Sequence, residues 1–310
     1  MNESLLTAAL TTVKSLETIL MGKTAQIEDA LITLFADGHL LLEDLPGMGK
    51  TTLAQGIAHC LGLDHQRIQF TSDLLPADIL GVSIFEPETG TFRFHEGPVF
   101  TQLLLADEIN RTSPKTQSAL LEVMEERNVT IEGKLYRLAK PFFVIATQNP
   151  STQFGTFPLP ESQLDRFLMR ISIGYPSPEV ELQILAQGDS RLRIDQLPQT
   201  LDHSQLLAIQ QACMAVHASA EIVDYLQRVL TFTRSSDRFT VGISPRGGLS
   251  LLKAAKARAW LKGRAHVLPE DIQKLIGPVF GHRLRTSDRV DELSTERLID
   301  LILDEVDVIR

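Results

Sequence analysis

Short, mainly apolar runs constrain the fold of this 310-residue chain more than any other feature. Three of them lie at 39–42, 103–106 and 142–146, and a weaker fourth at 169–173 predicts an edge strand. Runs of this length without polar alternation are typical of parallel strands that are buried on both faces. Because parallel strands need crossover connections, which are usually helices, the runs predict an α/β fold.

The distribution of helices and strands changes near Pro176. Before that point helical periodicity alternates with strand runs, which predicts a doubly wound parallel sheet in a domain over 1–175. Alternating segments at 82–94 and 129–138 predict two hairpins inserted into this domain. After Pro176 only helical segments of comparable strength follow, which predicts a small all-helical domain over 176–310. Its expected helices cover 204–217, 220–233, 245–261, 269–276 and 296–306.

The composition argues against several classes of protein. A formal charge of −9 and a pI of about 5.4 contrast with the basic excess of a general nucleic-acid coat. The two cysteines, Cys60 and Cys213, lie in apolar helical stretches and are expected to be packing residues, which excludes a disulfide framework or a cysteine-based metal site. No apolar run approaches the ~20 residues of a membrane span, so we expect a cytoplasmic protein.

The segment 43–52, here called the phosphate loop, lies between the first buried strand and a helix. Gly47 and Gly49 would let backbone N–H groups approach an anion at the helix N-terminus. Lys50 would reach the β- and γ-phosphates of ATP, and the Thr51 hydroxyl would bind Mg²⁺. The pattern G-x-x-x-x-G-K-[ST] lacks its first glycine because Asp44 stands there, so a plain strand-to-helix turn with an exposed lysine is the alternative. The nucleotide-binding residues expected in the loop are Pro46, Gly47, Met48, Gly49, Lys50, Thr51 and Thr52.

Polar residues also follow the other two buried strands. Asp107 and Glu108 end the strand run at 103–106, and Asn149 comes just after the run at 142–146. Ligands of open α/β sheets bind at the carboxyl ends of the strands, and two adjacent acids there need a cation nearby. Asp107 would hold Mg²⁺, Glu108 would polarise the attacking water, and Asn149 would bind that water or a γ-phosphate oxygen. The alternatives are solvated acids at a strand end and an asparagine that caps a turn.

Three strings resemble the MoxR family of AAA+ ATPases, in the helix-2-insert branch related to magnesium-chelatase AAA subunits. They are the segment 107–122, which begins Asp-Glu-Ile-Asn-Arg, the Ala-Thr-Gln-Asn-Pro of 146–150, and the Leu-Pro-Glu-Ser-Gln-Leu-Asp-Arg-Phe of 159–167. The likeness runs over 38–264. It implies a P-loop AAA+ domain followed by a helical lid domain, with Mg²⁺-dependent ATP hydrolysis between the subunits of a ring, which we expect to be hexameric.

The resemblance assigns roles to residues outside the strand ends. Arg166 matches the arginine finger that touches the γ-phosphate of the neighbouring subunit; a surface ion pair with Asp165 or Glu161 is the alternative. Arg246, in the first turn of a lid helix, matches the sensor-2 arginine that bridges the lid and the γ-phosphate. Gly22 resembles part of a segment that lines the adenine pocket, together with Ile19 and Met21.

The two hairpins resemble the insertions of this branch, which face the pore or the partner. Their exposed-looking residues are Phe92, Arg93, Phe94 and Tyr136, and simple cross-strand pairing is the alternative role. Arg111 could contact a neighbouring subunit's site or be a surface charge.

The function implied by the resemblance is chaperone-like remodelling, maturation or metal insertion of a client protein, often one with a von Willebrand factor A domain. Two other classes stay open: a nucleotide-gated assembly scaffold with negligible turnover, and a DNA-linked motor. The intact Glu108 argues against the first, and the acidity of the chain makes nucleic acid an unlikely partner.

Overall fold

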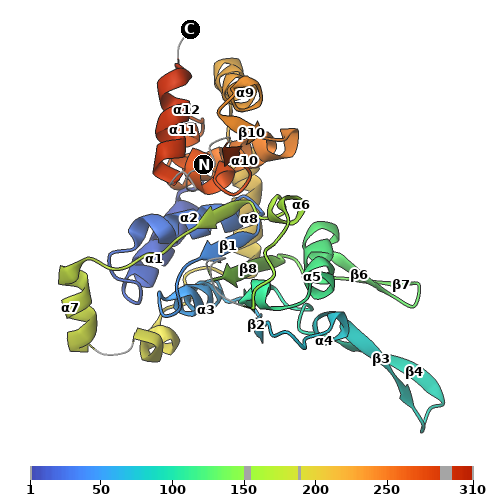
Figure 1. Ribbon diagram of the computed structural model, residues 1–310. Helices are drawn as coiled ribbons and strands as arrows, with labels where there is room; N and C mark the ends of the chain where they lie inside the picture. The colour runs from blue at the N-terminus through green and yellow to red at the C-terminus, as the bar shows by residue number, and fades with distance from the viewer. Residues whose placement is uncertain (1, 150–154, 188–189, 287–294, 309–310) are drawn as a thin grey trace.

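The computed structural model describes residues 2–149, 155–187, 190–286 and 295–308 (Figure 1). Its centre is a five-stranded sheet in the order β2-β5-β8-β1-β9, and every neighbouring pair of strands is parallel. The strands are β1 (Leu40–Glu43), β2 (His65–Gln69), β5 (Leu103–Asp107), β8 (Phe143–Gln148) and β9 (Met169–Ile171). The predicted parallel α/β fold and the edge position of β9 are confirmed.

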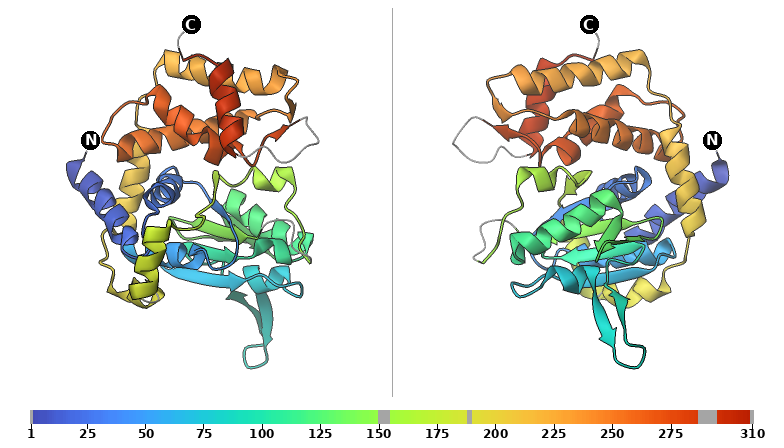
Figure 2. Two further views of the ribbon diagram at one scale, coloured as in Figure 1. Left: turned by 60° about the vertical axis from the view of Figure 1, so that its left-hand side comes forward. Right: turned by 90° about the vertical axis from the view of Figure 1, so that its right-hand side faces the viewer.

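Helices cover both faces of the sheet because successive side chains of a strand point to opposite faces. In β1, Leu40 and Leu42 join the core formed with the N-terminal helices, whereas Leu41 joins the core on the other face. One layer contains α1 (Glu3–Glu17), α2 (Thr24–Phe35) and α3 (Lys50–Cys60); the other contains α4 (Pro76–Leu80) and α5 (Pro114–Glu126). Figure 2 shows these layers from two sides. The short α4 was not predicted, since five residues carry too little periodicity.

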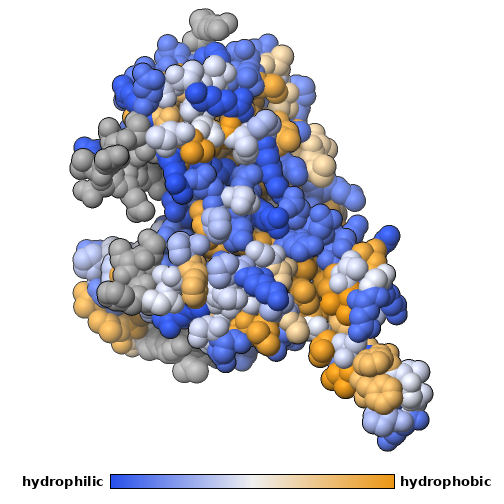
Figure 3. Space-filling view, turned by 45° about the vertical axis from the view of Figure 1, so that its right-hand side comes forward, coloured by the Kyte–Doolittle hydropathy of each residue, from blue (hydrophilic) through white to orange (hydrophobic). Residues whose placement is uncertain are grey.

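Both predicted hairpins are present. They are formed by β3 (Gly81–Glu86) with β4 (Thr91–Glu96), and by β6 (Asn128–Ile131) with β7 (Lys134–Arg137). The β3–β4 hairpin projects as an arm from the body of the molecule and carries exposed apolar residues (Figures 1 and 3). On this arm the rings of Phe85 and Phe92 pack edge to face 5.3 Å apart, and Phe92 is 67% exposed. Cross-strand pairing therefore accounts for part of the aromatic pattern but leaves an apolar surface open.

The chain after β9 is mainly helical. It forms α7 (Pro178–Gln187), α8 (His203–Met214), α9 (Ala220–Ser235), α10 (Pro245–Leu261), α11 (Pro269–Phe280) and α12 (Thr295–Glu305). Two short strands that the sequence did not predict, β10 (Phe239–Val241) and β11 (Arg285–Thr286), pair antiparallel in this part. Such strands are too short for alternation to be detected. Among the described helices, none is long and apolar enough to cross a membrane.

The apolar core is continuous between the sheet and the C-terminal helices. Trp260 of α10 is almost fully buried and packs edge to face against Phe35 of α2, with ring centroids 5.9 Å apart. Gln210 of α8 donates a hydrogen bond from Nε2 to the carbonyl of Leu34. The helical part is therefore fastened to the α1–α3 layer, and the boundary at 175/176 stays a prediction.

A buried histidine joins β1, α5 and β8. His39 is 5% exposed, its Nε2 lies 3.0 Å from the carbonyl of Met124, and its Nδ1 lies 3.0 Å from the amide of Val144. The amide is a donor and the carbonyl an acceptor, so the ring must be neutral with its proton on Nε2. Burial lowers the pKa of His39 to about 4. Protonation would charge the ring and remove the acceptor of the Val144 amide.

This neutral histidine makes stability depend on pH. The pKa of His39 is about 4 in the folded state and about 6.5 in the unfolded chain, so its contribution is complete above pH 6.5 and is lost as the pH falls toward 4. We expect His39 by itself to account for a loss of up to about 3 kcal/mol in the free energy of unfolding across this interval, read as the difference between the wild-type and His39→Gln profiles. Urea denaturation at several pH values measures the loss. His39→Gln should flatten this part of the profile, whereas the control His65→Gln, at an exposed histidine, should follow wild type.

Candidate active site

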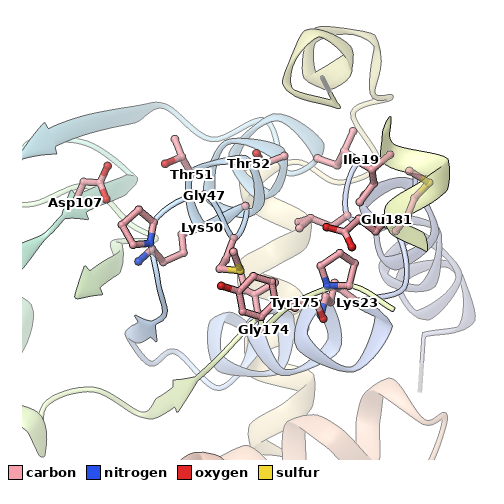
Figure 4. A pocket seen from close by; sticks show the side chains of 18 of the residues that line it. Ile19, Lys23, Gly47, Lys50, Thr51, Thr52, Asp107, Gly174, Tyr175 and Glu181 are labelled. Carbon is pink, nitrogen blue, oxygen red and sulfur yellow. The ribbon is translucent and has the colours of Figure 1, made fainter. Parts of the chain in front are cut away.

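The polar residues at the strand ends converge on one pocket of about 630 Å³, here called the loop pocket. Because the strands are parallel, β1, β5 and β8 deliver their carboxyl ends to the same edge of the sheet. Figure 4 shows Asp107, Thr51 and Lys50 toward one end of the pocket, and Ile19, Lys23 and Glu181 toward the other. The predicted residues that line it are Pro46, Gly47, Met48, Gly49, Lys50, Thr51, Thr52, Asp107, Glu108 and Asn149.

The phosphate loop has the backbone conformation that an anion cradle needs. Gly47 and Gly49 both have φ +87°, in the left-handed region that is disfavoured for residues with a Cβ. Gly49 is the N-cap of α3 and has no capping side chain, so the first N–H groups of this helix are directed at the loop pocket. The arrangement suits a phosphate group, which would supply the acceptors.

Lys50 is buried rather than exposed, which rejects the plain-turn alternative. Its side chain is 7% exposed, and Nζ donates to the carbonyl of Asp44 at 2.6 Å and to Oδ1 of Asn149 at 3.2 Å. Burial lowers the pKa of Lys50, while the nearby carboxylates of Asp44, Asp107 and Glu108 act in the opposite direction. An anion bound in the loop pocket would complete the neutralisation of this ammonium group.

The two acids at the end of β5 are held in fixed orientations. Thr147 of β8 donates its hydroxyl to Asp107 Oδ1 at 2.6 Å, and its oxygen accepts the amide of Glu108 at 2.8 Å. Glu108 has φ +57°, a left-handed conformation that is strained for a non-glycine residue and is enriched at functional sites. Asn149 Nδ2 donates to Glu108 Oε1 at 2.9 Å. Because Asn149 also accepts from Lys50, it connects Glu108 with Lys50.

Sequence reasoning missed two residues of β2 that contact these acids. Arg67 forms an ion pair with Asp107 at 2.7 Å, and Gln69 donates from Nε2 to Glu108 Oε2 at 3.0 Å. These two residues could have been found from the sequence, because polar residues occur in β2, and β2 is the neighbour of β5 in the sheet. Arg111 pairs with Glu108 of its own chain at 2.8 Å, so within this chain it is not merely a surface charge.

The far end of the loop pocket has apolar walls. Ile19 and Met21 line it as the resemblance implied, opposite Ile184 and Leu185 of α7. Gly22 is not among the lining residues. It has φ +71°, and a Cβ there would lie 3.1 Å from Val180 of α7, so Gly22 permits the α1–α2 turn to approach α7.

Lys50 contacts the backbone carbonyl of Asp44, whereas the carboxylate of Asp44 has other partners. It accepts the Ser172 hydroxyl at 2.9 Å and the backbone amides of Ile173 and Gly174. The carboxylate is therefore buried among hydrogen-bond donors of the same chain rather than solvated.

The two predicted arginines lie in a different pocket. Arg166 and Arg246 line a cavity of about 400 Å³, here called the arginine pocket, which shares no lining residue with the loop pocket. Both guanidinium groups contact the carboxylate of Glu125 in α5, at 3.2 Å and 3.0 Å. The pairing of Arg166 with Asp165 or Glu161 is not observed, since those acids bind Arg283 and Arg285. Arg246 thus lies beside Arg166 and away from its own phosphate loop.

The residues proposed for Mg²⁺ fit a hard cation. The Thr51 hydroxyl and the Asp107 carboxylate both line the loop pocket, and Mg²⁺ prefers a few protein oxygens together with phosphate oxygens and water. In the part of the chain that the structure describes, no group of three or more His, Cys, Asp or Glu residues could hold a metal by itself. A site of two protein ligands is therefore one that a phosphate would have to complete.

Comparisons with known proteins agree with this geometry. The family described as "ATPase family associated with various cellular activities (AAA)" matches residues 39–169, and an AAA lid domain matches residues 231–302. A solved structure of a candidate ATPase from Cytophaga hutchinsonii has a TM-score of 0.88 and 35% identity, covering 99% of this chain and 98% of that one. The fold and the site thus define an AAA+ ATPase with a C-terminal lid.

Two relatives narrow the family. "Uncharacterized protein YeaC" of Bacillus subtilis is 43% identical over 96% of this chain and 93% of its own length. "Chaperone MoxR1" of Mycobacterium tuberculosis is 40% identical over 93% of this chain and 79% of its own length. The chain belongs to the MoxR family of AAA+ ATPases, which confirms the family that the sequence motifs indicated.

Lys50 should be essential for nucleotide binding and dispensable for folding. Lys50→Ala removes the buried ammonium group that lines the loop pocket, so we expect the Kd for ATP to rise roughly 100-fold or more. Calorimetry measures the affinity, and circular dichroism checks the fold. Lys14→Ala, at an exposed lysine of α1, is the control that should bind as wild type does. Unchanged affinity in Lys50→Ala would contradict the site assignment.

Proposed function

We propose that this chain hydrolyses ATP with Mg²⁺ at the interfaces of a ring of identical subunits, expected to be a hexamer, and uses the cycle to remodel a client protein. The observation that carries the proposal is the division of the predicted catalytic residues between two pockets. Lys50, Asp107 and Glu108 lie in the loop pocket, whereas Arg166 and Arg246 lie in the arginine pocket. A complete site would need the loop pocket of one subunit and the arginine pocket of the next.

Within the loop pocket each residue has a separate task. Lys50 and the N–H groups of the phosphate loop bind the β- and γ-phosphates, and Thr51 and Asp107 hold Mg²⁺. Bound Mg²⁺ supplies charge neutralisation at the phosphates. Glu108 orients and polarises the attacking water. Asn149, which contacts both Lys50 and Glu108, keeps the water-orienting carboxylate in register with the phosphate-binding lysine.

The arginine pocket supports catalysis in trans. Glu125 pairs with two guanidinium groups that are 26% and 49% exposed, which leaves a net positive charge and keeps both arginines accessible at the surface of the subunit. A γ-phosphate carries more charge than one carboxylate, and it would draw Arg166 and Arg246 away from Glu125 when a neighbour binds ATP. The two arginines are therefore proposed to act together on the neighbour's nucleotide.

The client-directed part of the proposal has two supports. One relative carries the name chaperone, and the β3–β4 arm exposes Val82, Ile84, Phe85 and Phe92, which are a suitable contact surface for a protein partner. A partner with a von Willebrand factor A domain, and maturation or metal insertion as the outcome, are the specific forms we propose. The net charge of −9 disfavours the alternative of a DNA-linked motor. If DNA stimulated phosphate release at moderate salt, that alternative would be supported after all.

Glu108 should separate binding from chemistry. Glu108→Gln keeps the shape of the side chain and one acceptor oxygen, loses one of the two accepting positions, and removes the charge that polarises water. We expect ATP binding to be retained and phosphate release to fall by roughly 10²-fold or more, the scale of a lost general base. Glu122→Gln, at an exposed acid of α5 outside the loop pocket, is the matched control. Negligible turnover in wild type itself, with intact binding, would favour the scaffold instead.

Catalysis shared between subunits can be tested by mixing variants. Arg166→Ala alone should lower turnover by ~10³-fold, the scale measured for isolated arginine fingers. A mixture of Lys50→Ala and Arg166→Ala chains should regain activity, because some interfaces then combine an intact loop pocket with an intact arginine pocket. The control mixture of Lys50→Ala with the Lys50→Ala/Arg166→Ala double variant should stay inactive. If mixed rings assemble but regain no ATPase activity, Arg166 has no catalytic role in the neighbouring subunit and is only the ion-pair partner of Glu125.

A further inference from the structure

Asp44 occupies the position where the phosphate-loop pattern has its first glycine, and it makes contacts in two directions. Its backbone carbonyl accepts the Lys50 ammonium at 2.6 Å. Its carboxylate accepts the Ser172 hydroxyl at 2.9 Å, the Gly174 amide at 3.3 Å and the Ile173 amide. The side chain is 9% exposed, so these donors replace water around a buried negative charge. One residue therefore contacts both the phosphate-binding lysine and the chain that follows β9.

The chain that follows β9 forms one wall of the loop pocket. Residues 173–176, here called the wall segment, line the pocket and lead directly into α7, whose Ile184 and Leu185 line its apolar end. Lys23, in the turn between α1 and α2, donates from Nζ to the carbonyl of Tyr175 at 2.8 Å. The wall segment is thus attached at one end to the phosphate loop, through Asp44, and at the other to the turn beside Ile19 and Met21.

The charge of Asp44 makes the outcome of its removal informative. A carboxylate close to bound phosphates repels them, and if that were its main effect, neutralising it would tighten nucleotide binding. A carboxylate that holds three donors instead orders the wall segment before a nucleotide arrives, and pre-ordering a binding surface lowers the entropy lost on binding. The two effects have opposite signs. The directions of the hydrogen bonds favour the second, because the donors lie on the wall segment and on Ser172.

We propose that Asp44 is a positioning residue that fastens the wall segment to the phosphate loop and so sets the affinity of the loop pocket for nucleotide. This inference rests on the proposed nucleotide-binding role of the loop pocket. Asparagine cannot replace the carboxylate, since its amide nitrogen is a donor and would face a backbone N–H. Asp44 contacts no reacting atom, so it should affect KM rather than kcat once the pocket is saturated.

The test compares three single substitutions in the full-length chain. Asp44→Asn should raise the Kd for ATP and for ADP about ten-fold, the loss expected for one charge-assisted contact, and should raise KM with kcat within about two-fold of wild type. Ser172→Ala removes one donor and leaves the loop untouched, so its rise should be smaller and in the same direction. Asp224→Asn is the matched control, because this acid pairs with Arg228 at 2.9 Å and lines neither pocket.

Amide hydrogen exchange gives a readout that a change of charge alone would not produce. In wild type the amides of Ile173 and Gly174 should be protected, and Asp44→Asn should release them while amides of β1 stay protected. Equal or tighter ATP binding in Asp44→Asn, or an equal loss in Asp224→Asn, would overturn the proposal. If Lys50→Ala also bound ATP normally, the nucleotide-site assignment itself would be wrong, and this inference would be wrong with it. If Lys50→Ala lost ATP binding while Asp44→Asn did not, only the role proposed for Asp44 would be wrong.

Discussion

A buried ammonium group is the constraint on which the site depends. Lys50 lies under the phosphate loop, and burial lowers its pKa while Asp44, Asp107 and Glu108 act to raise it. The dependence is mutual, since the carboxylates at this sheet edge need cations nearby, which Lys50, Arg67 and Arg111 supply. The remaining neutral contacts, from the Asp44 carbonyl and Asn149, fix the lysine in place. The parallel sheet makes this convergence possible because it brings the ends of β1, β5 and β8 together.

The parts of this arrangement that could be predicted from the sequence are those encoded locally. Each strand run and the polar residue after it are contiguous in the chain, so Lys50, Asp107 and Asn149 could be assigned to one edge without knowing the strand order. The contacts of Asp44 with Ser172 and of Glu125 with Arg246 join residues that are far apart in sequence, and no local pattern encodes them. The five-residue α4 and the strands β10 and β11 were missed for another reason: they are too short for their period to repeat in the sequence.

The continuous core explains how the two pockets can belong to one working unit. Trp260 and Gln210 fasten the C-terminal helices to α2, and α2 belongs to the layer that also holds α3 and its phosphate loop. The arginine pocket is built from α5 and α10 together, so its shape depends on how the helical part sits against the sheet. A shift of α10 would therefore change the separation of Arg246 from Arg166. The sequence suggested two domains in series, whereas the packing makes their contact part of the site.

Asp44 shows why a motif position can depart from its pattern without loss of the loop. Glycine is required where the backbone takes a positive φ, as at Gly47 and Gly49, and Asp44 is not among the described non-glycine residues with positive φ. A side chain is therefore tolerated at this position, provided that it does not point at the anion. The carboxylate meets that condition because its oxygens accept the amides of Ile173 and Gly174. The same contacts give the residue a use that glycine could not have, which is to hold a wall of the pocket that begins far along the chain.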